Sequence, residues 1–518
     1  MHSADTPALD PLDIDDLDPA RVVEVARGRT QVRIGTEALE RVARGRAHVA
    51  ALAGSAAPAY GVSTGFGALA TVAIPPDRRA ALQVSLVRSH AAGSGHLVDA
   101  EVVRAMMLLR LHTLCSGSTG VRPELVTALA GLLGSGLVPA VHEHGSLGCS
   151  GDLAPLAHVA LVLLGEGHVV GPDGCLAPAG PQLRAAGLAP VVLAEKEGLA
   201  LINGTDGMLG MLCLALADLQ DLLVVADLGA AMSVEALLGT DRAFAADLVA
   251  MRPHPGQARA AATIRRMLAS SPIVASHRTD TTHLVQDAYS LRCAPQVSGS
   301  ARDTVAHAMT VADRELHSVI DNPVVTPDGR VESNGNFHGA PVAHVLDFLA
   351  IAVADVASIS ERRTDRLLDR ARNQGLPPFL AHEVGVDSGY MIAQYTAAGI
   401  VAELARLATP ASVASIPSSA MQEDHVSMGW AAGLKLRRAV DGLRQVLAIE
   451  LLVAARALDL RAPIPPAAGT GAVRDALRTV VAGPGPDRVV ADEIAAVTRL
   501  VGSGQVRAAA EGAVGPLA

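Results

Sequence analysis

The stretch Val141-His-Glu-His-Gly-Ser-Leu-Gly-Cys-Ser-Gly-Asp-Leu-Ala-Pro-Leu156 joins a glycine-rich loop to an apolar segment. Asp152 and Pro155 are residue types typical of the first turn of a helix, and the apolar run from Leu153 to Leu164 continues the pattern. The stretch therefore predicts a helix that starts near Asp152 and holds the preceding loop at its N-terminus.

Ser150 lies in this loop between Cys149 and Gly151. A nucleophilic serine on a sharp turn would need the pattern Gly-x-Ser-x-Gly, but Asp152 stands where the second glycine belongs. Another reaction suits the tripeptide better: the Gly151 amide nitrogen attacks the Cys149 carbonyl carbon, and Ser150 then loses its hydroxyl as water. Glycine favours such a closure because its backbone is the least hindered. The product would be an electrophilic methylidene-imidazolone ring, activated by the positive end of the helix dipole. A plain serine in a flexible turn is the alternative.

The composition indicates a helical protein. Hydrophobic residues make up 50% of the 518 residues and charged residues 18%, but aromatic residues only 2%. The core must therefore consist of Ala, Val and Leu, which suit closely packed helices better than sheets. Most of the later predicted helices exceed the average helix length, which indicates a bundle; they span residues 207–238, 300–318, 340–369, 389–407 and 431–458.

The first part of the chain is richer in loops, with shorter predicted helices at 78–92, 101–114 and 123–133. A break rich in proline and glycine follows the long helices at Pro463–Gly471. We therefore predict three parts: residues 1–206 with the loop, residues 207–462 with the long helices, and residues 463–518 with two short helices.

Charge and cysteine usage exclude several classes of function. The net charge is −10 and no basic run occurs, which argues against a nucleic-acid partner and favours a small molecule. The longest charge-free stretch, residues 47–76, is broken by glycines and prolines, so we expect no membrane span there. The N-terminus is polar and rich in aspartate, unlike a secretory signal, which predicts a cytoplasmic protein. The cysteines are scattered and suggest neither a disulfide framework nor a metal site; they are Cys115, Cys149, Cys175, Cys213 and Cys293.

The loop around Ser150 resembles the prosthetic-group loop of the aromatic amino acid ammonia-lyases, in which Ala-Ser-Gly is the usual triplet. Further segments resemble the same family in the same order, so the resemblance covers nearly the whole chain. It implies an all-α fold similar to the long-helix bundles of fumarase and aspartase. It also implies the prosthetic group 4-methylidene-imidazole-5-one (MIO), formed from Cys149, Ser150 and Gly151, and a homotetramer whose active sites draw on three subunits.

The resemblance assigns catalytic roles to several residues. The segment Tyr60–Gly67 is similar to the family's flexible lid, whose tyrosine is an acid or base, and Asn203 matches a residue that hydrogen-bonds near the prosthetic group. In the later segment, Tyr289 matches a second catalytic tyrosine, Arg292 a residue that grips the substrate carboxylate, and Gln286 a pocket residue. We predict that Tyr60 is the base and that Tyr289 tunes it or donates, although the sequence leaves the reverse assignment open.

Two residues indicate which ring the substrate carries. His90 stands at the family's ring-selectivity position, and Glu423 stands where the phenylalanine-type enzymes generally carry glutamine. A glutamate can accept the N–H of an imidazole, which a phenyl ring does not offer. Asn322 and Phe337 match pocket residues. The resemblance thus implies the elimination of ammonia from L-histidine to give trans-urocanate.

Other interpretations stay open on the sequence alone. A lyase or a 2,3-aminomutase acting on another aromatic amino acid would carry the same ring. A helical scaffold that never cyclises would keep the fold without the chemistry, and a related helical lyase could use a serine base. Cys149 departs from the usual alanine of the triplet, and the role of its thiol is not determined.

Overall fold

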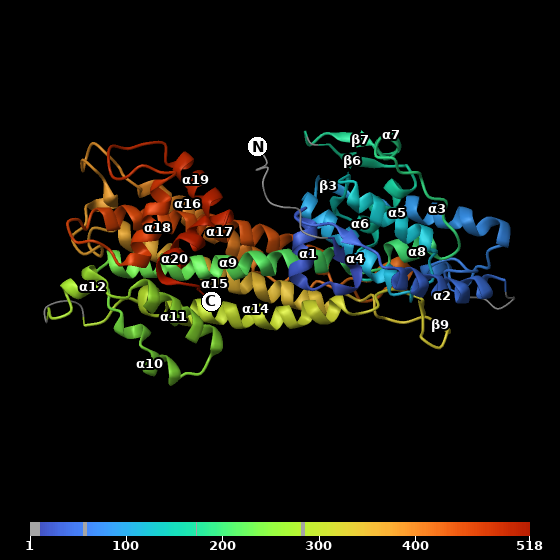
Figure 1. Cartoon of the computed structure of the whole chain (residues 1–518), viewed down its shortest axis with the longest axis horizontal. Helices are drawn as coiled ribbons and strands as arrows, with labels where there is room; N and C mark the ends of the chain where they lie inside the picture. Colours follow the sequence, from blue (N-terminus) through green and yellow to red (C-terminus); the bar gives the residue numbers. More distant parts are fainter. Residues whose placement is uncertain (1–10, 55–59, 172, 281–284, 518) are drawn as a thin grey trace. The chain divides into compact units, whose positions relative to one another are not determined.

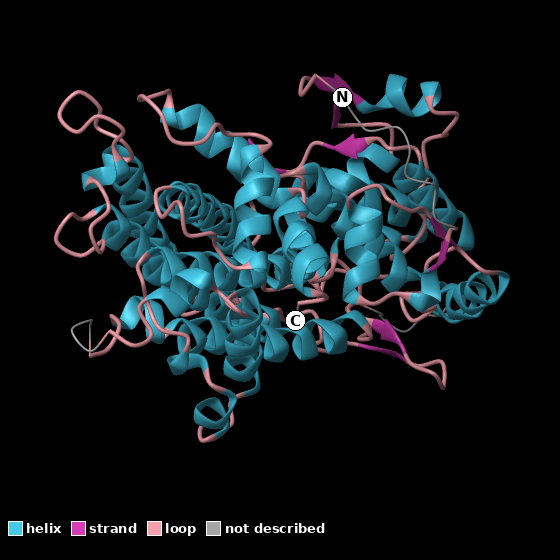
Figure 2. Ribbon diagram, turned by 60° about the vertical axis from the view of Figure 1, so that its left-hand side comes forward, coloured by secondary structure: helices cyan, strands magenta, loops and turns pink. Residues whose placement is uncertain are grey.

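The computed structural model describes residues 11–54, 60–171, 173–280 and 285–517, and helices dominate it (Figures 1 and 2). The strands are short and form small two- or three-stranded sheets. The all-α fold class predicted from the Ala, Val and Leu core is therefore confirmed. The expectation that the N-terminus is not a secretory signal includes residues 1–10, which lie outside the described residues.

The chain forms two compact units, each assembled from three segments. Unit 1 comprises Met1–Leu214, Met309–Asp347 and Pro410–Leu434, and unit 2 comprises Ala215–Ala308, Phe348–Thr409 and Lys435–Ala518. Four long helices run from one unit into the other; they are α9 (Asp206–Ala236), α14 (Ala294–Leu316), α15 (Ala340–Leu368) and α17 (Gly429–Asp459). The division at residues 206 and 462 stays a prediction.

Unit 1 holds eight helices of its own and all the strands of the described residues. Its helices are α1 (Pro19–Ala26), α2 (Thr36–Ala53), α3 (Arg79–His90), α4 (Ala100–Cys115), α5 (Pro123–Gly134), α6 (Leu153–Leu163), α7 (Ala179–Ala185) and α8 (Glu197–Ile202). Its strands are β1 (Leu12–Asp13), β2 (Val32–Arg33), β3 (Ser94–Leu97), β4 (Val138–Pro139), β5 (His142–His144), β6 (His168–Val170), β7 (Leu176–Pro178), β8 (Val324–Val325) and β9 (Val331–Glu332).

The loop that contains Ser150 is held between a strand and a helix of unit 1. Strand β5 pairs antiparallel with β3, with Ser94 opposite His144, and α6 begins directly after the loop. Helix α6 packs against α3 and α8, and eight of its eleven residues are buried because nearly all of them are apolar. The predicted helix after Asp152 is thus present, and it fixes the C-terminal end of the loop.

Unit 2 consists of helices in its described residues. Besides the parts of the long helices, it contains α10 (Ala246–Ala250), α11 (Pro255–Met267), α12 (Pro272–Ser276), α13 (Tyr289–Arg292), α16 (Met391–Leu407), α18 (Ala468–Arg478), α19 (Val490–Gly502) and α20 (Gln505–Val514). Its core includes several buried carboxylates, and one of them, Glu450, accepts hydrogen bonds from Ser233, Ser360 and Arg363. Such pairing is what makes a buried charge tolerable.

The C-terminal part differs from the sequence-based expectation. Two short helices were predicted after residue 463, but the structure has three, α18 to α20. The segment from Val490 to Val514 is split because Gly504 adopts a left-handed backbone (φ +77°) that ends one helix and starts the next.

Helices α9 and α15 are long and apolar enough to cross a membrane by length and composition alone. The most apolar window of α9 is 83% buried and that of α15 is 56% buried inside the protein. Burial of this kind is what the core helices of a helical bundle need, so their apolar character is explained by packing.

Candidate active site

The backbone around Ser150 is locked by a glycine-to-glycine contact. Gly151 has a left-handed backbone (φ +78°), and a Cβ added to it would lie 2.1 Å from the Gly204 carbonyl oxygen. The next residue, Asp152, donates its amide to the same oxygen at 2.7 Å. Only glycine fits at position 151, and the contact brings the tripeptide beside Asn203.

The Asp152 side chain ties the loop to the start of α9 rather than capping α6. Its carboxylate accepts the Met208 amide at 2.9 Å and the Ser146 hydroxyl at 2.9 Å, while the cap of α6 has no side-chain hydrogen bond. The prediction that α6 starts near Asp152 is correct. The Asp152 carboxylate, however, accepts a backbone amide of α9 and none of α6. Complete burial raises the pKa of Asp152 to about 7.

Glu423 meets the tripeptide directly. Its Oε1 accepts the Ser150 hydroxyl at 3.0 Å, and its Oε2 accepts the Cys149 thiol at 3.1 Å. Glu423 lies more than 270 residues further along the chain than this loop. The sequence-predicted imidazole acceptor is therefore in contact with the predicted prosthetic-group residues.

Burial keeps the Cys149 thiol protonated. Desolvation, followed by the nearby Glu423 charge, raises the pKa of Cys149 to about 12. At neutral pH the thiol is thus a hydrogen-bond donor to the carboxylate, not a thiolate.

Asn203 contacts the tripeptide from the other side. Its Nδ2 donates to the Ser150 carbonyl oxygen at 3.3 Å, and its side chain is 4% exposed. Among the described residues, its Oδ1 has no hydrogen-bond partner although it is fully buried. An unpaired buried acceptor is costly, which indicates a position held for a ligand donor.

Two buried ion pairs support these loops, and the sequence analysis missed both. Arg110 on α4 donates to the Asn203 carbonyl at 2.6 Å and to the Ile320 carbonyl at 2.9 Å, and it lies 3.5 Å from Asp206. Lys196 pairs with Asp321, and both side chains are fully buried, which lowers the pKa of Lys196. The signal that could have revealed Arg110 is its position inside the apolar run Met106–Leu111.

We expect Arg110→Met to destabilise the fold by on the order of 3–5 kcal/mol, because it leaves the Asp206 carboxylate buried without its cation. The midpoint of thermal or urea denaturation, followed by circular dichroism, measures the loss. Arg104→Met is the matched control on α4: Arg104 also donates to two carbonyls, those of Val25 and Ala26. An equal loss in both variants would contradict the role of the ion pair.

The lid segment Tyr60–Gly67 lies against the other loops of unit 1. The Tyr60 hydroxyl accepts the Gly67 amide at 3.1 Å, and the Tyr60 ring meets the Phe66 ring edge to face. A Cβ on Gly67 would lie 3.1 Å from Ser419 Oγ, close to the Glu423 segment. The structure therefore places the lid beside the loop that carries Glu423.

His90 ends helix α3, the helix that packs against α6 and α8. Its Nδ1 contacts the Leu86 carbonyl oxygen at 2.9 Å. The Ser89 hydroxyl also lies 3.1 Å from Nδ1, so local contacts engage this nitrogen and Nε2 is the nitrogen left for a substrate.

Asn322 and Phe337 belong to two adjoining segments of unit 1. Asn322 Oδ1 accepts the Ser333 hydroxyl and the Asn334 amide, both at 3.0 Å. The residue after Phe337, His338, stacks its ring on that of His425 at 5.7 Å between centroids. The segment that contains Phe337 is thus held against the Glu423 loop.

The remaining predicted residues lie in unit 2. Tyr289 and Arg292 form the short helix α13, and the Arg292 guanidinium lies 4.7 Å from the Tyr289 ring centroid. The Tyr289 side chain is 72% exposed, and Gln286 is exposed as well. Unit 1 thus holds Tyr60, His90, Asn203, Asn322, Phe337, Glu423 and the tripeptide, whereas Gln286, Tyr289 and Arg292 belong to the other unit.

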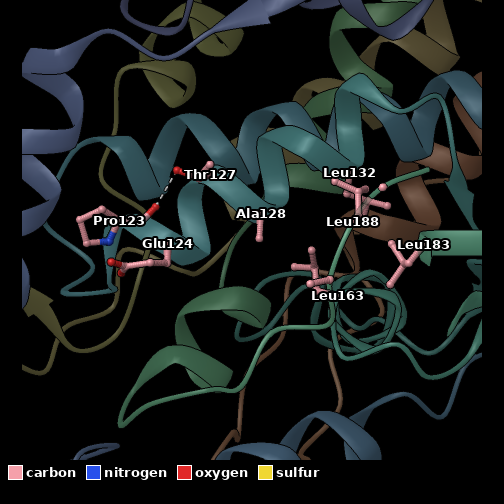
Figure 3. A pocket seen from close by; sticks show the side chains of 10 residues that line it. Pro123, Glu124, Thr127, Ala128, Leu132, Leu163, Leu183 and Leu188 are labelled. Atoms are coloured by element: carbon pink, nitrogen blue, oxygen red, sulfur yellow. Dashed lines mark hydrogen bonds between the residues drawn. The ribbon is translucent and has the colours of Figure 1, made fainter. Parts of the chain in front are cut away.

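A cavity of about 390 Å³ between α5, α6 and α7 is separate from these residues (Figure 3). Leu132, Leu163 and Leu183 line it, and Thr127 turns its hydroxyl back to the Pro123 carbonyl. Glu124 is the one ionisable side chain among the ten described residues around it. The cavity therefore lacks the groups that an elimination needs.

Comparison with known proteins gives one consistent family. The profile described as aromatic amino acid lyase matches residues 17–479. A histidine ammonia-lyase of Streptomyces coelicolor is 61% identical over 96% of this chain and 97% of its own, and one of Anaeromyxobacter dehalogenans is 49% identical over 95% and 98%.

Solved structures agree. Histidine ammonia-lyase from Trypanosoma cruzi matches with a TM-score of 0.89 and 38% identity, covering 98% of this chain and 95% of that one. Tyrosine aminomutase from Streptomyces globisporus matches with a TM-score of 0.93 and 36% identity, covering 98% and 100%.

Proposed function

Since the chain belongs to the aromatic amino acid lyase family, we propose that it removes ammonia from L-histidine to give trans-urocanate. It is a carbon–nitrogen lyase, and its curated relatives at 60–61% identity are histidine ammonia-lyases. The observation that carries the choice of substrate is the contact of Glu423 with Cys149 and Ser150. This contact puts an acceptor for an imidazole N–H at the predicted reaction centre. The proposed site of action is the cytoplasm.

The residues present fit the prosthetic group MIO. Gly151 is the one residue type that its contact with Gly204 tolerates, and its nitrogen would close the ring on the Cys149 carbonyl carbon with loss of one water. Ser150 would then lose its hydroxyl as a second water. When formed, the ring would supply an electrophilic methylidene carbon that accepts the lone pair of the substrate amine, making the nitrogen a better leaving group.

Asn203 stabilises charge at one defined atom. Its Nδ2 donates to the Ser150 carbonyl oxygen, and there it would stabilise the negative charge that the prosthetic group takes up when it acts as an electrophile. A donor fixed in a buried site is worth more than the same donor in water, because it does not have to reorient. The orphaned Oδ1 of Asn203 is an acceptor for a donor that the ligand brings.

The other residues bind and deprotonate the substrate. In the assignment we favour, Tyr60 is the base that takes the β-proton. Tyr289 either adjusts the basicity of Tyr60 or donates a proton. Arg292 pairs with the substrate carboxylate through its planar guanidinium, and Gln286, Asn322 and Phe337 line the pocket. His90 and Glu423 hold the imidazole. Positioned acids and bases contribute on the order of 10²- to 10⁴-fold in rate, and orientation and the electrophile supply the rest.

The active protein is proposed to be a homotetramer with sites shared between subunits. Tyr289 is 72% exposed on its unit, although it is assigned to a catalytic centre. Helices α15 and α16 expose large apolar side chains in unit 2, namely Phe348, Ile351, Ile392 and Tyr395. Subunit contacts would cover such surfaces.

Mixing two inactive variants tests the shared site. We expect Tyr60→Phe and Arg292→Ala each to be nearly inactive alone, and to regain part of the histidine activity when they are co-expressed in one cell. Recovery is expected because some mixed sites then combine a normal Tyr60 from one chain with a normal Arg292 from another. If the co-expressed mixture stays as inactive as the single variants, both residues come from the same chain.

The substrate assignment is tested with the purified protein. L-histidine should be converted with the near-ultraviolet absorbance of urocanate and an equal amount of ammonia, while L-phenylalanine and L-tyrosine should react far more slowly. Chromatography for β-amino acids separates a lyase from an aminomutase. Protein that carries the ring but leaves L-histidine unchanged would refute the proposal.

A further inference from the structure

The two oxygens of the Glu423 carboxylate accept hydrogen bonds from two neighbouring residues of the tripeptide. Oε1 accepts the Ser150 hydroxyl at 3.0 Å and Oε2 accepts the Cys149 thiol at 3.1 Å. Among the described residues, these are the two hydrogen bonds recorded for this carboxylate, and the side chain of Cys149 is buried.

The two donors have different fates in the proposed chemistry. Ring formation uses the carbonyl carbon of residue 149 and leaves its side chain outside the ring, so the thiol survives. The Ser150 hydroxyl leaves as water together with the proton of its Cα, so its hydrogen bond to Oε1 disappears. After cyclisation, Oε1 has lost its donor while Oε2 keeps the thiol.

We infer that Cys149 is a positioning residue for substrate recognition: its thiol holds Oε2 of Glu423 and so directs the vacated Oε1 to the imidazole N–H of the substrate. The inference rests on the proposed function, since it assumes a substrate with an imidazole. The thiol can act in this way at neutral pH because burial keeps it protonated, with its pKa raised to about 12.

Because the thiol acts on the imidazole only through Glu423, we expect an effect of the size of one ordinary hydrogen bond. Cys149→Ala removes the donor and should raise the KM for L-histidine by roughly 3- to 10-fold, while kcat falls less. Intact mass should still be lower by two waters, because the ring does not use the side chain. Cys149→Ser keeps a donor of similar size and should recover most of the loss. Cys175→Ala, at an exposed cysteine between β6 and β7, controls for thiol removal as such.

A binding measurement separates positioning from turnover. In the Ser150→Ala background, which cannot form the ring and also lacks the Ser150 hydroxyl, calorimetry with imidazolepropionate should give a dissociation constant that Cys149→Ala raises roughly 3- to 10-fold. Phenylpropionate, which offers no ring N–H, should bind equally with and without the thiol. Cys149→Ser should again resemble the parent.

Each outcome decides the inference. It is supported if the alanine variant weakens imidazole ligands alone and serine restores their binding. It is overturned if alanine changes nothing, if serine is as poor as alanine, or if phenylpropionate weakens equally, which would indicate a packing role. If the unaltered protein fails to convert L-histidine, the proposed function falls and the inference with it. If the unaltered protein converts L-histidine normally and the Cys149 variants change neither KM nor the dissociation constant, the inference is wrong but the proposed function stands.

Discussion

Ser150→Ala is expected to lower kcat for L-histidine by at least about three orders of magnitude, the scale on which loss of a covalently reacting group reduces turnover. Without Oγ there is no hydroxyl to leave, so no methylidene carbon forms to accept the amine. The mass of the purified variant should equal that of its unmodified sequence or be lower by one water at most. A steady-state urocanate assay and intact-mass spectrometry measure the two effects.

The control is Ser135→Ala, which removes a hydroxyl at the C-terminal end of α5 and should keep both the activity and the loss of two waters relative to its own sequence. Circular dichroism should show the same helix content for both variants, because Ser150 lies in a loop. Substantial histidine turnover by Ser150→Ala would mean that Ser150 does not form the electrophile.

Glu423→Gln is expected to lower kcat/KM for L-histidine by roughly 10- to 100-fold, the value of a hydrogen bond to a charged group. The amide keeps the size of the side chain but removes the charge and one acceptor oxygen. The low kcat/KM for L-phenylalanine, whose ring has no N–H to offer, should not decrease. The ratio of kcat/KM for phenylalanine to that for histidine should therefore rise. Competing-substrate assays give the ratio directly.

Asp424→Asn is the matched control, because it neutralises the adjacent, exposed carboxylate. It should change neither kcat/KM for L-histidine nor the preference for histidine over phenylalanine. Intact mass of Glu423→Gln must be checked as well, since this carboxylate also contacts Ser150. A variant with a complete ring and unchanged histidine selectivity would show that Glu423 does not recognise the imidazole.

Helices were the most predictable part of the fold, because apolar periodicity sets them locally. The long segment predicted at 207–238 is α9, Asp206–Ala236, and the one at 340–369 is α15, Ala340–Leu368. The two compact units could not be predicted in this way. Four of the long helices pass from one unit into the other, so composition shows no change at the boundary.

The residues of the site could be proposed only through resemblance, since single residues such as His90 or Phe337 carry no local pattern that marks them. The contacts that connect them depend on tertiary structure. The hydrogen bond from the Cys149 thiol to the Glu423 carboxylate joins residues 274 positions apart. Arg110 acts from a buried position, where a charge in an apolar segment was the one available sign. Asp152 was expected at the start of α6, but its carboxylate binds the first turn of α9, which a sequence pattern does not indicate.

In the proposed mechanism, Cys149, Ser150 and Gly151 form the electrophile. Intact-mass and peptide-mass spectrometry of the purified, unaltered protein test this step. We expect a chain lighter by two water molecules, with the loss confined to the peptide that contains residues 149–151. A chain of unmodified mass that still converts L-histidine to urocanate would contradict it.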